Sequence, residues 1–263
     1  MAYGLVLEGG GARGAYQIGA CKAIKEMSLE ISVVAGTSVG ALNGAMVVQG
    51  DIDRAYDIWS DLHPERVLKL SGDHLEGYDG NRFSPEALKK FAGYIMKVIY
   101  EGGLDVEPLE RLVKSVVDED RIRKSKIGFG IVTVDLTARR AVEIYKEEIP
   151  RGKLVDYVIA SASFPAFKRT IIDGRTYVDG ALYNNLPINM VTNRGVKDII
   201  LLRTRAIGIK RRIDTSGLNI VSISPGENLG SSMDFSNRSA RRKLQMGYED
   251  ACRVLEKYLG GRG

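Results

Sequence analysis

Ile31-Ser32-Val33-Val34-Ala35-Gly36-Thr37-Ser38-Val39-Gly40 joins an apolar, β-branched run to the pattern G-x-S-x-G. That pattern is the sequence form of a nucleophile elbow, a sharp strand-to-helix turn that projects a serine Oγ out of the backbone. The small residues at 41–45 let a helix pack closely behind the strand. The stretch therefore predicts an α/β fold in which Ser38 is a candidate nucleophile, with Gly36 and Gly40 as the glycines of the elbow.

Histidine, the usual base for such a serine, is scarce in this chain. The two histidines, His63 and His74, both follow soon after the serine. In hydrolases with the order Ser…Asp/Glu…His, the histidine comes last and far downstream. Neither histidine fits that order, so either the elbow has no catalytic role or another group takes the serine proton.

A second glycine-rich stretch, Gly9-Gly10-Gly11-Ala12-Arg13-Gly14, follows the apolar run at residues 3–7. Such a turn supplies backbone N–H donors, because glycine lets the backbone approach a ligand without a side chain in the way. Acyl transfer needs these donors at the tetrahedral oxyanion, where one donor lowers the barrier by about 2.7–4 kcal/mol. Arg13 would add positive charge or brace the loop; a tight turn without a ligand is the structural alternative.

Gly9, Gly11 and Gly14 also satisfy the dinucleotide-binding pattern G-x-G-x-x-G. That pattern requires an acidic residue about 20 positions further on, at the end of the second strand. Here the second strand ends in Ala35-Gly36-Thr37-Ser38, and Glu30 precedes it. The sequence therefore argues against a dinucleotide, and it indicates no other cofactor.

Asp179-Gly180-Ala181 follows the strand-like residues 176–178. A carboxylate can accept the serine proton directly if it lies within about 2.6–3.2 Å of Oγ. Asp-Gly is also an ordinary turn dipeptide, and the chain contains Asp79-Gly80 and Asp173-Gly174 as well. The dipeptide alone therefore does not identify Asp179 as the base.

The glycine loop at 9–14, the elbow at 36–40 and Asp179-Gly180-Ala181 occur in one order that resembles the patatin-like phospholipase family. Members of this family pair a G-G-G-x-[RK]-G loop with a G-x-S-x-G elbow and a distal D-G-[GA]. The similarity extends to Ala160-Ser161-Ala162-Ser163-Phe164-Pro165 and to Asn185-Leu186-Pro187. It covers residues from about 5 to about 203.

This resemblance implies a three-layer α/β/α sandwich with a mainly parallel central sheet, and hydrolysis of phospholipids or related acyl esters. It implies Ser38 as the nucleophile and Asp179 as the base, without a histidine. Backbone N–H groups of the glycine loop would form the oxyanion hole, with Gly10 and Gly11 as donors and Val39 as a further one. The residues assigned to this hole are Gly9, Gly10, Gly11, Arg13 and Gly14. The resemblance implies no metal ion or organic cofactor.

The composition fits one domain spanning residues 1–263, because a chain of 263 residues with 44% hydrophobic content can bury one good core. We expect the motif-bearing part at about residues 5–203 and a helical extension at about 234–259. No stretch reaches the roughly 18 apolar residues of a membrane span, and residues 1–7 lack the features of a signal peptide. Cys21 and Cys252 have no metal-ligand spacing. They predict two reduced thiols in a cytoplasmic protein; a secreted protein with one disulfide is the alternative.

The chain is mildly basic, with a formal net charge of +5 and a pI near 9.1. Two loose clusters carry much of this charge: Arg203, Arg205, Lys210, Arg211 and Arg212, and Arg238, Arg241, Arg242 and Lys243. A solvated surface explains such clusters; peripheral contact with an anionic membrane, at about 1 kcal/mol per basic residue, is the functional alternative. No nucleic-acid partner is indicated, since no recognition motif accompanies the 7% of aromatic residues.

Short apolar runs alternate with helical spacing along the chain, which favours a mainly parallel sheet. We expect strands at residues 3–7, 31–35, 127–134, 141–145, 170–172, 176–178, 199–202 and 220–223, with a hairpin turn at Asp173-Gly174. We expect helices at residues 12–27, 39–48, 51–62, 85–101, from 108, 154–162 and 234–259. Residues 63–80 are a candidate lid, and residues 63–103 are the best candidate for a substrate cap.

Three functions are compatible with these patterns. The leading hypothesis is a serine esterase that hydrolyses lipid acyl esters through an acyl-Ser38 intermediate. An acyltransferase would use the same intermediate and give the acyl group to an alcohol or a lysolipid. A non-catalytic membrane- or protein-binding module would keep only the fold, and the intact Ser38, Asp179 and glycine loop argue against it.

Overall fold

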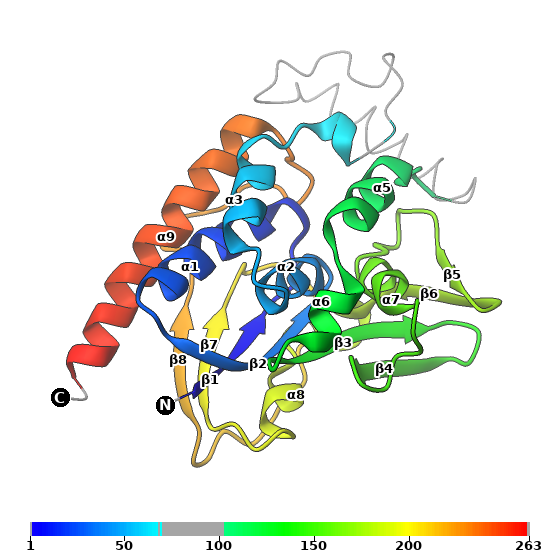
Figure 1. The fold of residues 1–263 in the computed structure, drawn as a ribbon. Helices are drawn as coiled ribbons and strands as arrows, with labels where there is room; N and C mark the ends of the chain where they lie inside the picture. The colour runs from blue at the N-terminus through cyan, green and yellow to red at the C-terminus, as the bar shows by residue number, and fades with distance from the viewer. Residues whose placement is uncertain (1, 68, 70–102, 262–263) are drawn as a thin grey trace.

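The computed structural model describes residues 2–67, 69 and 103–261, and an eight-stranded mixed sheet forms the centre of this part of the chain (Figure 1). The strands are β1 Ala2–Leu7, β2 Glu30–Thr37, β3 Gly128–Asp135, β4 Arg140–Tyr145, β5 Thr170–Ile172, β6 Arg175–Asp179, β7 Asp198–Leu202 and β8 Asn219–Ile223. Hydrogen bonds connect them in the order β5-β6-β3-β2-β1-β7-β8, and β4 pairs with β3. Five neighbouring strands, from β3 to β8 in this order, run parallel. The antiparallel pairings are confined to the side of β3, β4, β5 and β6.

The helices that flank this sheet follow most of the parallel strands, as expected for an α/β fold. The helices are α1 Gly14–Glu26, α2 Val39–Val48, α3 Ile52–Ser60, α5 Glu107–Val116, α6 Glu119–Lys124, α7 Leu154–Ser161, α8 Ile188–Thr192 and α9 Asn237–Gly260. Short 3-10 turns lie at Gly11–Arg13, Pro64–Arg66 and Gly180–Leu182. The predicted α/β class is therefore confirmed, with a sheet that is mixed at one side.

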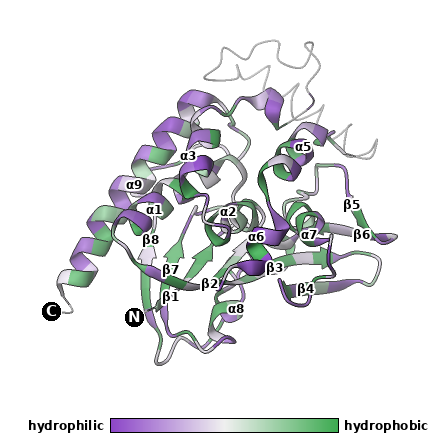
Figure 2. Ribbon diagram, in the orientation of Figure 1, coloured by the Kyte–Doolittle hydropathy of each residue, from purple (hydrophilic) through white to green (hydrophobic). Residues whose placement is uncertain are grey.

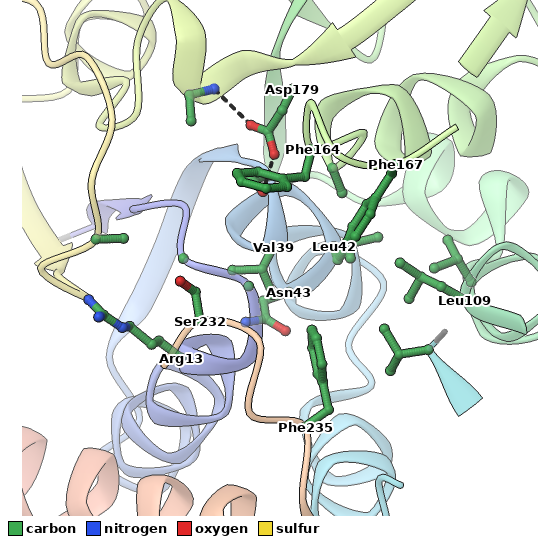
Figure 3. Close-up of a pocket in the computed structure, with 18 of the residues that line it drawn as sticks. Arg13, Val39, Leu42, Asn43, Leu109, Phe164, Phe167, Asp179, Ser232 and Phe235 are labelled. Carbon is green, nitrogen blue, oxygen red and sulfur yellow. Dashed lines mark hydrogen bonds between the residues drawn. The ribbon is translucent and has the colours of Figure 1, made fainter. Parts of the chain in front are cut away.

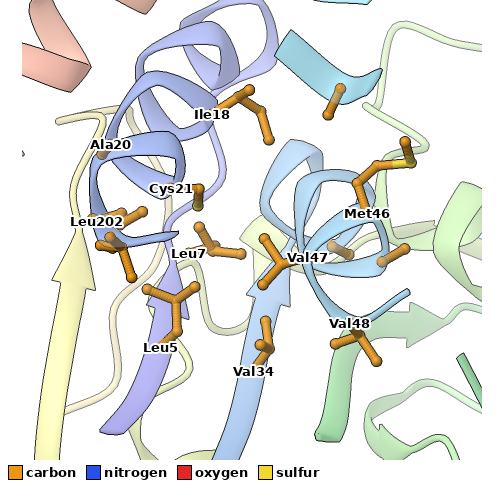
Figure 4. Close-up of a cluster of buried hydrophobic side chains, with 14 of the residues drawn as sticks. Leu5, Leu7, Ile18, Ala20, Cys21, Val34, Met46, Val47, Val48 and Leu202 are labelled. Carbon is orange, nitrogen blue, oxygen red and sulfur yellow. The ribbon is translucent and has the colours of Figure 1, made fainter. Parts of the chain in front are cut away.

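Both faces of the sheet are buried, because successive side chains along a strand point to opposite faces. In β1, Leu5 and Leu7 belong to the larger core, which packs beneath α1 and α2 (Figure 4). Val6 belongs to a second, smaller core with Met190 and Val191 of α8. The hydropathy colouring shows the same distribution, with hydrophobic central strands under helices of mixed character (Figure 2). The two helical layers are thus unequal, since, among the helices of the described residues, the short α8 is the one that packs on the second core.

Helix α9 crosses α1 at a contact that requires glycine on both helices. A Cβ on Gly19 would lie 1.9 Å from the carbonyl oxygen of Leu244, and a Cβ on Gly247 would lie 1.9 Å from that of Tyr16. The Tyr16 hydroxyl donates a hydrogen bond to Asp250 Oδ2 at 2.9 Å and fixes the same pair of helices further along. The predicted helical extension is therefore packed directly against the first helix of the fold.

Most expected elements occur, with shifts at their ends. The hairpin turn is confirmed, since Asp173 and Gly174 both have positive φ, as a type I′ turn requires. The closing helix begins at Asn237 because a turn held by the Asp234 carboxylate precedes it. Two short helices, α6 and α8, were not expected, because five or six residues are too few to display helical periodicity. The helix expected at 85–101, His74 and most of the candidate lid and cap lie outside the described residues.

Candidate active site

Strands β2 and β6 meet end to end on one edge of β3, and this arrangement creates the site. Residues 130–132 of β3 pair with β4 and β2, and residues 133–135 pair with β4 and β6. A strand has two edges, so β2 and β6 share the edge opposite β4. Because β2 is parallel and β6 antiparallel to β3, their carboxyl ends converge: Thr37 pairs with Val132 and Asp179 with Thr133.

The elbow has the strained backbone that its sequence predicts. Ser38 has φ 58° and ψ −129°, a conformation that non-glycine residues rarely adopt and that is found at functional turns. A Cβ on Gly36 would lie 2.2 Å from the carbonyl oxygen of Gly40, and a Cβ on Gly40 would lie 2.2 Å from that of Leu7. Both positions therefore require glycine, and the turn holds Ser38 at the start of α2.

Ser38 and Asp179 form a buried hydrogen-bonded pair (Figure 3). The Ser38 Oγ donates to Asp179 Oδ2 at 2.6 Å, and the Ala181 N–H donates to Asp179 Oδ1 at 2.8 Å. The two residues are 8% and 2% exposed. Burial raises the pKa of Asp179 from 3.8 to about 6, while the hydrogen bonds from Ser38 and Ala181 act in the opposite direction. A carboxylate with this pKa is ionised at neutral pH and is still basic enough to accept a proton.

The glycine loop presents two backbone N–H groups without an acceptor among the described residues, those of Gly10 and Gly11. The other N–H groups of the loop are already used. Gly9 donates to Asn185 O at 3.2 Å, and Arg13 donates to Gly10 O at 3.1 Å. Gly14 donates to Gly11 O. Of the five residues assigned to the oxyanion hole, Gly10 and Gly11 are therefore the two whose N–H groups are available to a ligand.

Arg13 holds the loop from behind instead of presenting its charge to Ser38. Its Nε donates to Gly230 O at 3.0 Å, and its Nη1 donates to Thr204 O at 3.3 Å and Arg205 O at 2.9 Å. Figure 3 shows the guanidinium end of this side chain directed towards the neighbouring loop at the left. Of the two roles considered for Arg13, the contacts therefore favour bracing.

Two further residues fix the glycine loop, and the sequence patterns missed both. The buried Glu8 carboxylate accepts hydrogen bonds through Oε2 from the backbone N–H groups of Thr204, at 2.7 Å, and Arg205, at 3.0 Å. The Thr204 Oγ1 donates to Gly9 O at 2.5 Å. The segment after β7 is thereby attached to the start of the loop. No local motif signals these contacts, because nearly 200 residues of chain separate the partners.

Ser161 holds the backbone of Ser38 from a third element. Its Oγ accepts a hydrogen bond from the Ser38 N–H at 2.9 Å and donates one to Val132 O at 2.6 Å. The side chain therefore links the elbow to β3 from the end of α7. The segment that contains Ser161 is part of the family resemblance, but no sequence pattern assigned a role to this serine.

A cavity of about 450 Å³ opens next to the pair and is lined mainly by apolar side chains. It extends from Ser38 along one face of α2, past Leu42 to Met46, and is bounded by α3 and α5. Figure 3 shows Leu109, Phe164, Phe167 and Phe235 around this space. The lining also includes Gly10, Gly11, Asn43, Trp59, Val116 and Asn185. The site thus combines the polar Ser38–Asp179 pair with an adjoining cavity that is lined mainly by apolar side chains.

The described site contains no histidine and no cluster of metal-ligating side chains. His63 is exposed, lies 4.0 Å from Asp61 and does not line the cavity. Within residues 2–67, 69 and 103–261, no group of three or more His, Cys, Asp or Glu side chains is arranged to hold a metal ion. In the same part of the chain, no helix has the length and apolar character needed to cross a membrane.

Residues 5–192 match the sequence model of the patatin-like phospholipase family. The chain belongs to the patatin-like phospholipase family. The resemblance in the three motifs is confirmed by this match, which includes the glycine loop, the elbow and Asp179. Strands β7 and β8 and helix α9 lie beyond the matched residues.

Relatives in this family are much longer than the present chain. It is 28% identical over 210 residues to "Patatin-like phospholipase domain-containing protein 6" of Mus musculus, an alignment that covers 75% of this chain and 13% of the mouse protein. It is 28% identical over 202 residues to "Neuropathy target esterase sws" of Drosophila melanogaster, which covers 76% and 12%. The chain thus spans about an eighth of the length of these relatives.

Two solved structures have the same fold. VipD from Legionella pneumophila superimposes with a TM-score of 0.60 at 16% identity, over 97% of this chain and 67% of that one. Human GIVD cytosolic phospholipase A2 superimposes with a TM-score of 0.55 at 11% identity, over 98% and 59%. At these identities the likeness concerns the fold, and it supports the predicted α/β architecture.

Proposed function

We propose that this chain is a serine esterase of the lipid acyl hydrolase type, with Ser38 as nucleophile and Asp179 as base. The observation that carries the proposal is the 2.6 Å hydrogen bond from Ser38 Oγ to a buried carboxylate whose pKa is raised to about 6. Membership in a family of phospholipases supports the ester as substrate. The adjoining apolar cavity supports a lipid acyl chain as part of that substrate.

Acylation begins when Ser38 Oγ attacks the carbonyl carbon of the ester and its proton passes to Asp179 Oδ2. The negative charge that develops on the carbonyl oxygen is stabilised by the free N–H groups of Gly10 and Gly11. Val39 adds positive potential, since the first residue of a helix has an N–H without an intrahelical partner. The bond to the leaving alcohol then breaks, and the alcohol takes the proton from Asp179.

Deacylation repeats these steps with water. Asp179 accepts a proton from a water molecule while the water oxygen attacks the acyl carbon. The tetrahedral intermediate forms at the same N–H groups and collapses to the free fatty acid. The proton returns from Asp179 to Ser38 Oγ, which restores the starting state.

The acyl chain is proposed to lie along α2. Because a helix rises about 1.5 Å per residue, the part of α2 from Ser38 to Met46 is about 12 Å long. Bonds of about 1.5 Å between carbons give an extended chain about 1.3 Å per carbon, so this length holds roughly nine or ten carbons. Each methylene moved from water into the cavity contributes about 0.8 kcal/mol to binding.

The cavity mouth is proposed to contact an anionic membrane surface. Exposed apolar side chains gather at or near the mouth: Phe164, Leu182, Ile207 and Ile209. The segment that contains Ile207 and Ile209 also carries the exposed cations Arg205, Arg211 and Arg212. Apolar and basic groups together are the combination that binds peripheral proteins to anionic lipid. We propose that Arg238, Arg241 and Arg242 of the second basic cluster, at the start of α9, are a solvated surface. Lys243 is not part of that surface, because its side chain is buried and its Nζ donates to Asp234 O at 3.2 Å.

We also propose that residues 1–263 act as one domain in the cytoplasm. The packing of α9 on α1 supports one folding unit. Neither Cys21 nor Cys252 forms a disulfide, in keeping with a reducing compartment.

The proposal is tested with the purified protein and p-nitrophenyl esters of graded chain length, followed by phosphatidylcholine and phosphatidylglycerol vesicles. We expect hydrolysis by the wild type and background rates with Ser38→Ala. Product analysis with and without an added lysophospholipid separates hydrolysis from acyl transfer. Equal rates for the wild type and Ser38→Ala would disprove the assignment.

A further inference from the structure

Asn185 is the one residue of the described cavity lining with a side-chain amide that is fully buried and entirely without hydrogen bonds. It has 0% exposure, and neither Oδ1 nor Nδ2 has a partner among the described residues. Buried polar side chains are nearly always hydrogen-bonded, so an exception at a site calls for a functional reason. The Asn185-Leu186-Pro187 segment belongs to the family resemblance, but the proposed mechanism gives it no task.

Asn43 provides a direct comparison within the same cavity lining. Its Nδ2 donates to Gly14 O and to Gln17 Oε1, each at 2.9 Å, and its Oδ1 accepts from Trp59 Nε1 at 3.1 Å. This asparagine is saturated by the protein and ties α1, α2 and α3 together. The amide of Asn185, in contrast, has no hydrogen-bond partner among the described residues.

The backbone holds Asn185 rigidly between the two halves of the reaction centre. The Gly9 N–H donates to Asn185 O at 3.2 Å, and the Asn185 N–H donates to Ile209 O at 2.6 Å. The preceding carbonyl, that of Asn184, accepts a hydrogen bond from Thr37 Oγ1 at 2.8 Å. The segment is therefore attached to the glycine loop on one side and to the elbow on the other.

Two glycines leave the space that the amide occupies. A Cβ on Gly9 would lie 2.2 Å from Asn185 Oδ1 and 3.1 Å from the Ser38 Cβ. A Cβ on Gly208 would lie 2.7 Å from Asn185 Nδ2. The amide thus lies beside the glycine loop, close to the nucleophile, at a place where two side chains are missing.

We propose that the Asn185 side chain is a third donor to the oxyanion, next to the N–H groups of Gly10 and Gly11. An ester offers only acceptor oxygens, so the amide contributes through its NH₂ group. Rotation of the amide about χ2 exchanges its two ends and turns this group towards the carbonyl oxygen. This role rests on the proposed esterase function and makes Asn185 a catalytic residue of that reaction.

The test replaces Asn185 by leucine, which has the same four side-chain heavy atoms branched at Cγ and no hydrogen-bonding group. With a p-nitrophenyl ester, we expect kcat to fall about 10²–10³-fold with KM nearly unchanged, as for the loss of one oxyanion donor. The Tm should stay the same or rise, because the variant no longer buries an unpaired amide. A merely structural role predicts that activity and Tm fall together.

Asn184→Leu is the matched control. Asn184 is equally buried, but its Nδ2 donates to Glu143 Oε1 at 3.0 Å and to Asn189 Oδ1 at 2.8 Å. Its replacement leaves those acceptors without their donor, so the Tm should fall. If Asn185→Leu does not fold, Asn185→Ala gives the same kinetic test, with the same loss of kcat expected.

Labelling by a fluorophosphonate separates this inference from the proposed function, because the adduct on Ser38 has a tetrahedral centre with an oxygen in the oxyanion position. We expect rapid labelling of the wild type and labelling slowed at least 10-fold in Asn185→Leu. An unlabelled wild type would overturn both proposals. Equal labelling rates, or an unchanged kcat, would overturn the role of Asn185 alone.

Discussion

Ser38 donates a hydrogen bond to Asp179 because the sheet register places the ends of β2 and β6 next to each other. Thr37, the last residue of β2, pairs with Val132 of β3, and Asp179, the last residue of β6, pairs with the next residue, Thr133. Ser38 and Asp179 are separated by 141 positions in the chain. A shift of either strand by one residue would turn its side chains to the opposite face. Strand pairing therefore sets the geometry of the candidate site, which depends on the antiparallel part of the sheet as much as on the elbow.

The nucleophile and the base should be indispensable to a similar degree. We expect Ser38→Ala and Asp179→Asn to lower kcat by roughly 10⁴–10⁶-fold, as removal of a nucleophile or its base does in serine hydrolases. Circular dichroism should show that both variants fold. The matched control is the double variant His63→Ala, His74→Ala, whose kcat should stay within a factor of two of the wild type. A large loss of kcat in this control would mean that a histidine is the base.

Activity should follow the ionisation of Asp179. Because only the carboxylate accepts the serine proton, kcat/KM should rise about tenfold per pH unit below the pKa and level off above it. Burial raises this pKa to about 6, so the midpoint should lie near pH 6. A kcat/KM profile with soluble p-nitrophenyl butyrate measures it. A midpoint near 4, or one above 8, would contradict this account.

The same ionisation should reduce stability. The folded state holds the Asp179 proton more tightly than the unfolded chain, whose pKa is close to 3.8, so the free energy of unfolding falls as pH rises from about 4 to about 6. Above pH 6 the free energy of unfolding stays lower by an amount on the order of 3 kcal/mol, at about 1.4 kcal/mol per unit of pKa. Asp179→Asn removes this loss of stability.

Urea unfolding of Asp179→Asn at two pH values checks this expectation. The variant should be more stable than the wild type at pH 7.5, and the difference should shrink towards zero at pH 4. Asp173→Asn serves as the control, since that carboxylate is exposed in a hairpin turn. If the wild type were more stable than Asp179→Asn at pH 7.5, ionisation of Asp179 would not reduce stability.

Met46 should limit acyl-chain length, because it lines the cavity at the far end of the stretch of α2 that begins at Ser38. We expect Met46→Ala to move the preferred p-nitrophenyl ester to a chain two to three carbons longer, because the truncation opens space there. The variant should lose about 2–5 kcal/mol of stability, as buried truncations do. Val47→Ala is the control: Val47 is buried in the core and does not line the cavity, so stability should fall with an unchanged chain-length profile.

The exposed mouth should govern binding to vesicles. We expect the double variant Ile209→Ser, Arg212→Ser to bind phosphatidylglycerol vesicles at least tenfold more weakly, since it loses one apolar and one basic contact. Hydrolysis of a short soluble ester should change little. Leu259→Ser, an exposed leucine near the end of α9, should leave vesicle binding unchanged. Sedimentation with vesicles measures the binding of the wild type, the double variant and Leu259→Ser. If the double variant binds as tightly as the wild type, this surface is not the membrane contact.

The features that depend on local chemistry were predictable from the sequence. The pattern G-x-S-x-G, together with the apolar strand before it and the small residues after it, predicts the elbow, and Gly36 is required by the turn because a Cβ there would meet Gly40 O. Asp179 was different, because Asp-Gly pairs occur elsewhere, and the family resemblance singled it out. Glu8, Ser161, Thr204 and Asn185 carried no signal of their own, since their roles depend on partners that only the folded sheet brings near.

The segment before helix α9 lies beyond the residues that the family model matches, and yet it contacts the glycine loop and the cavity. Ser232 O accepts the N–H of Ala12, the carbonyl of Gly230 receives Arg13, and Phe235 lines the cavity. A truncation at the family boundary would keep both members of the pair and lose the support of the oxyanion loop. Substitutions in residues 230–235 would therefore act on the support of the glycine loop while Ser38 and Asp179 stay unchanged.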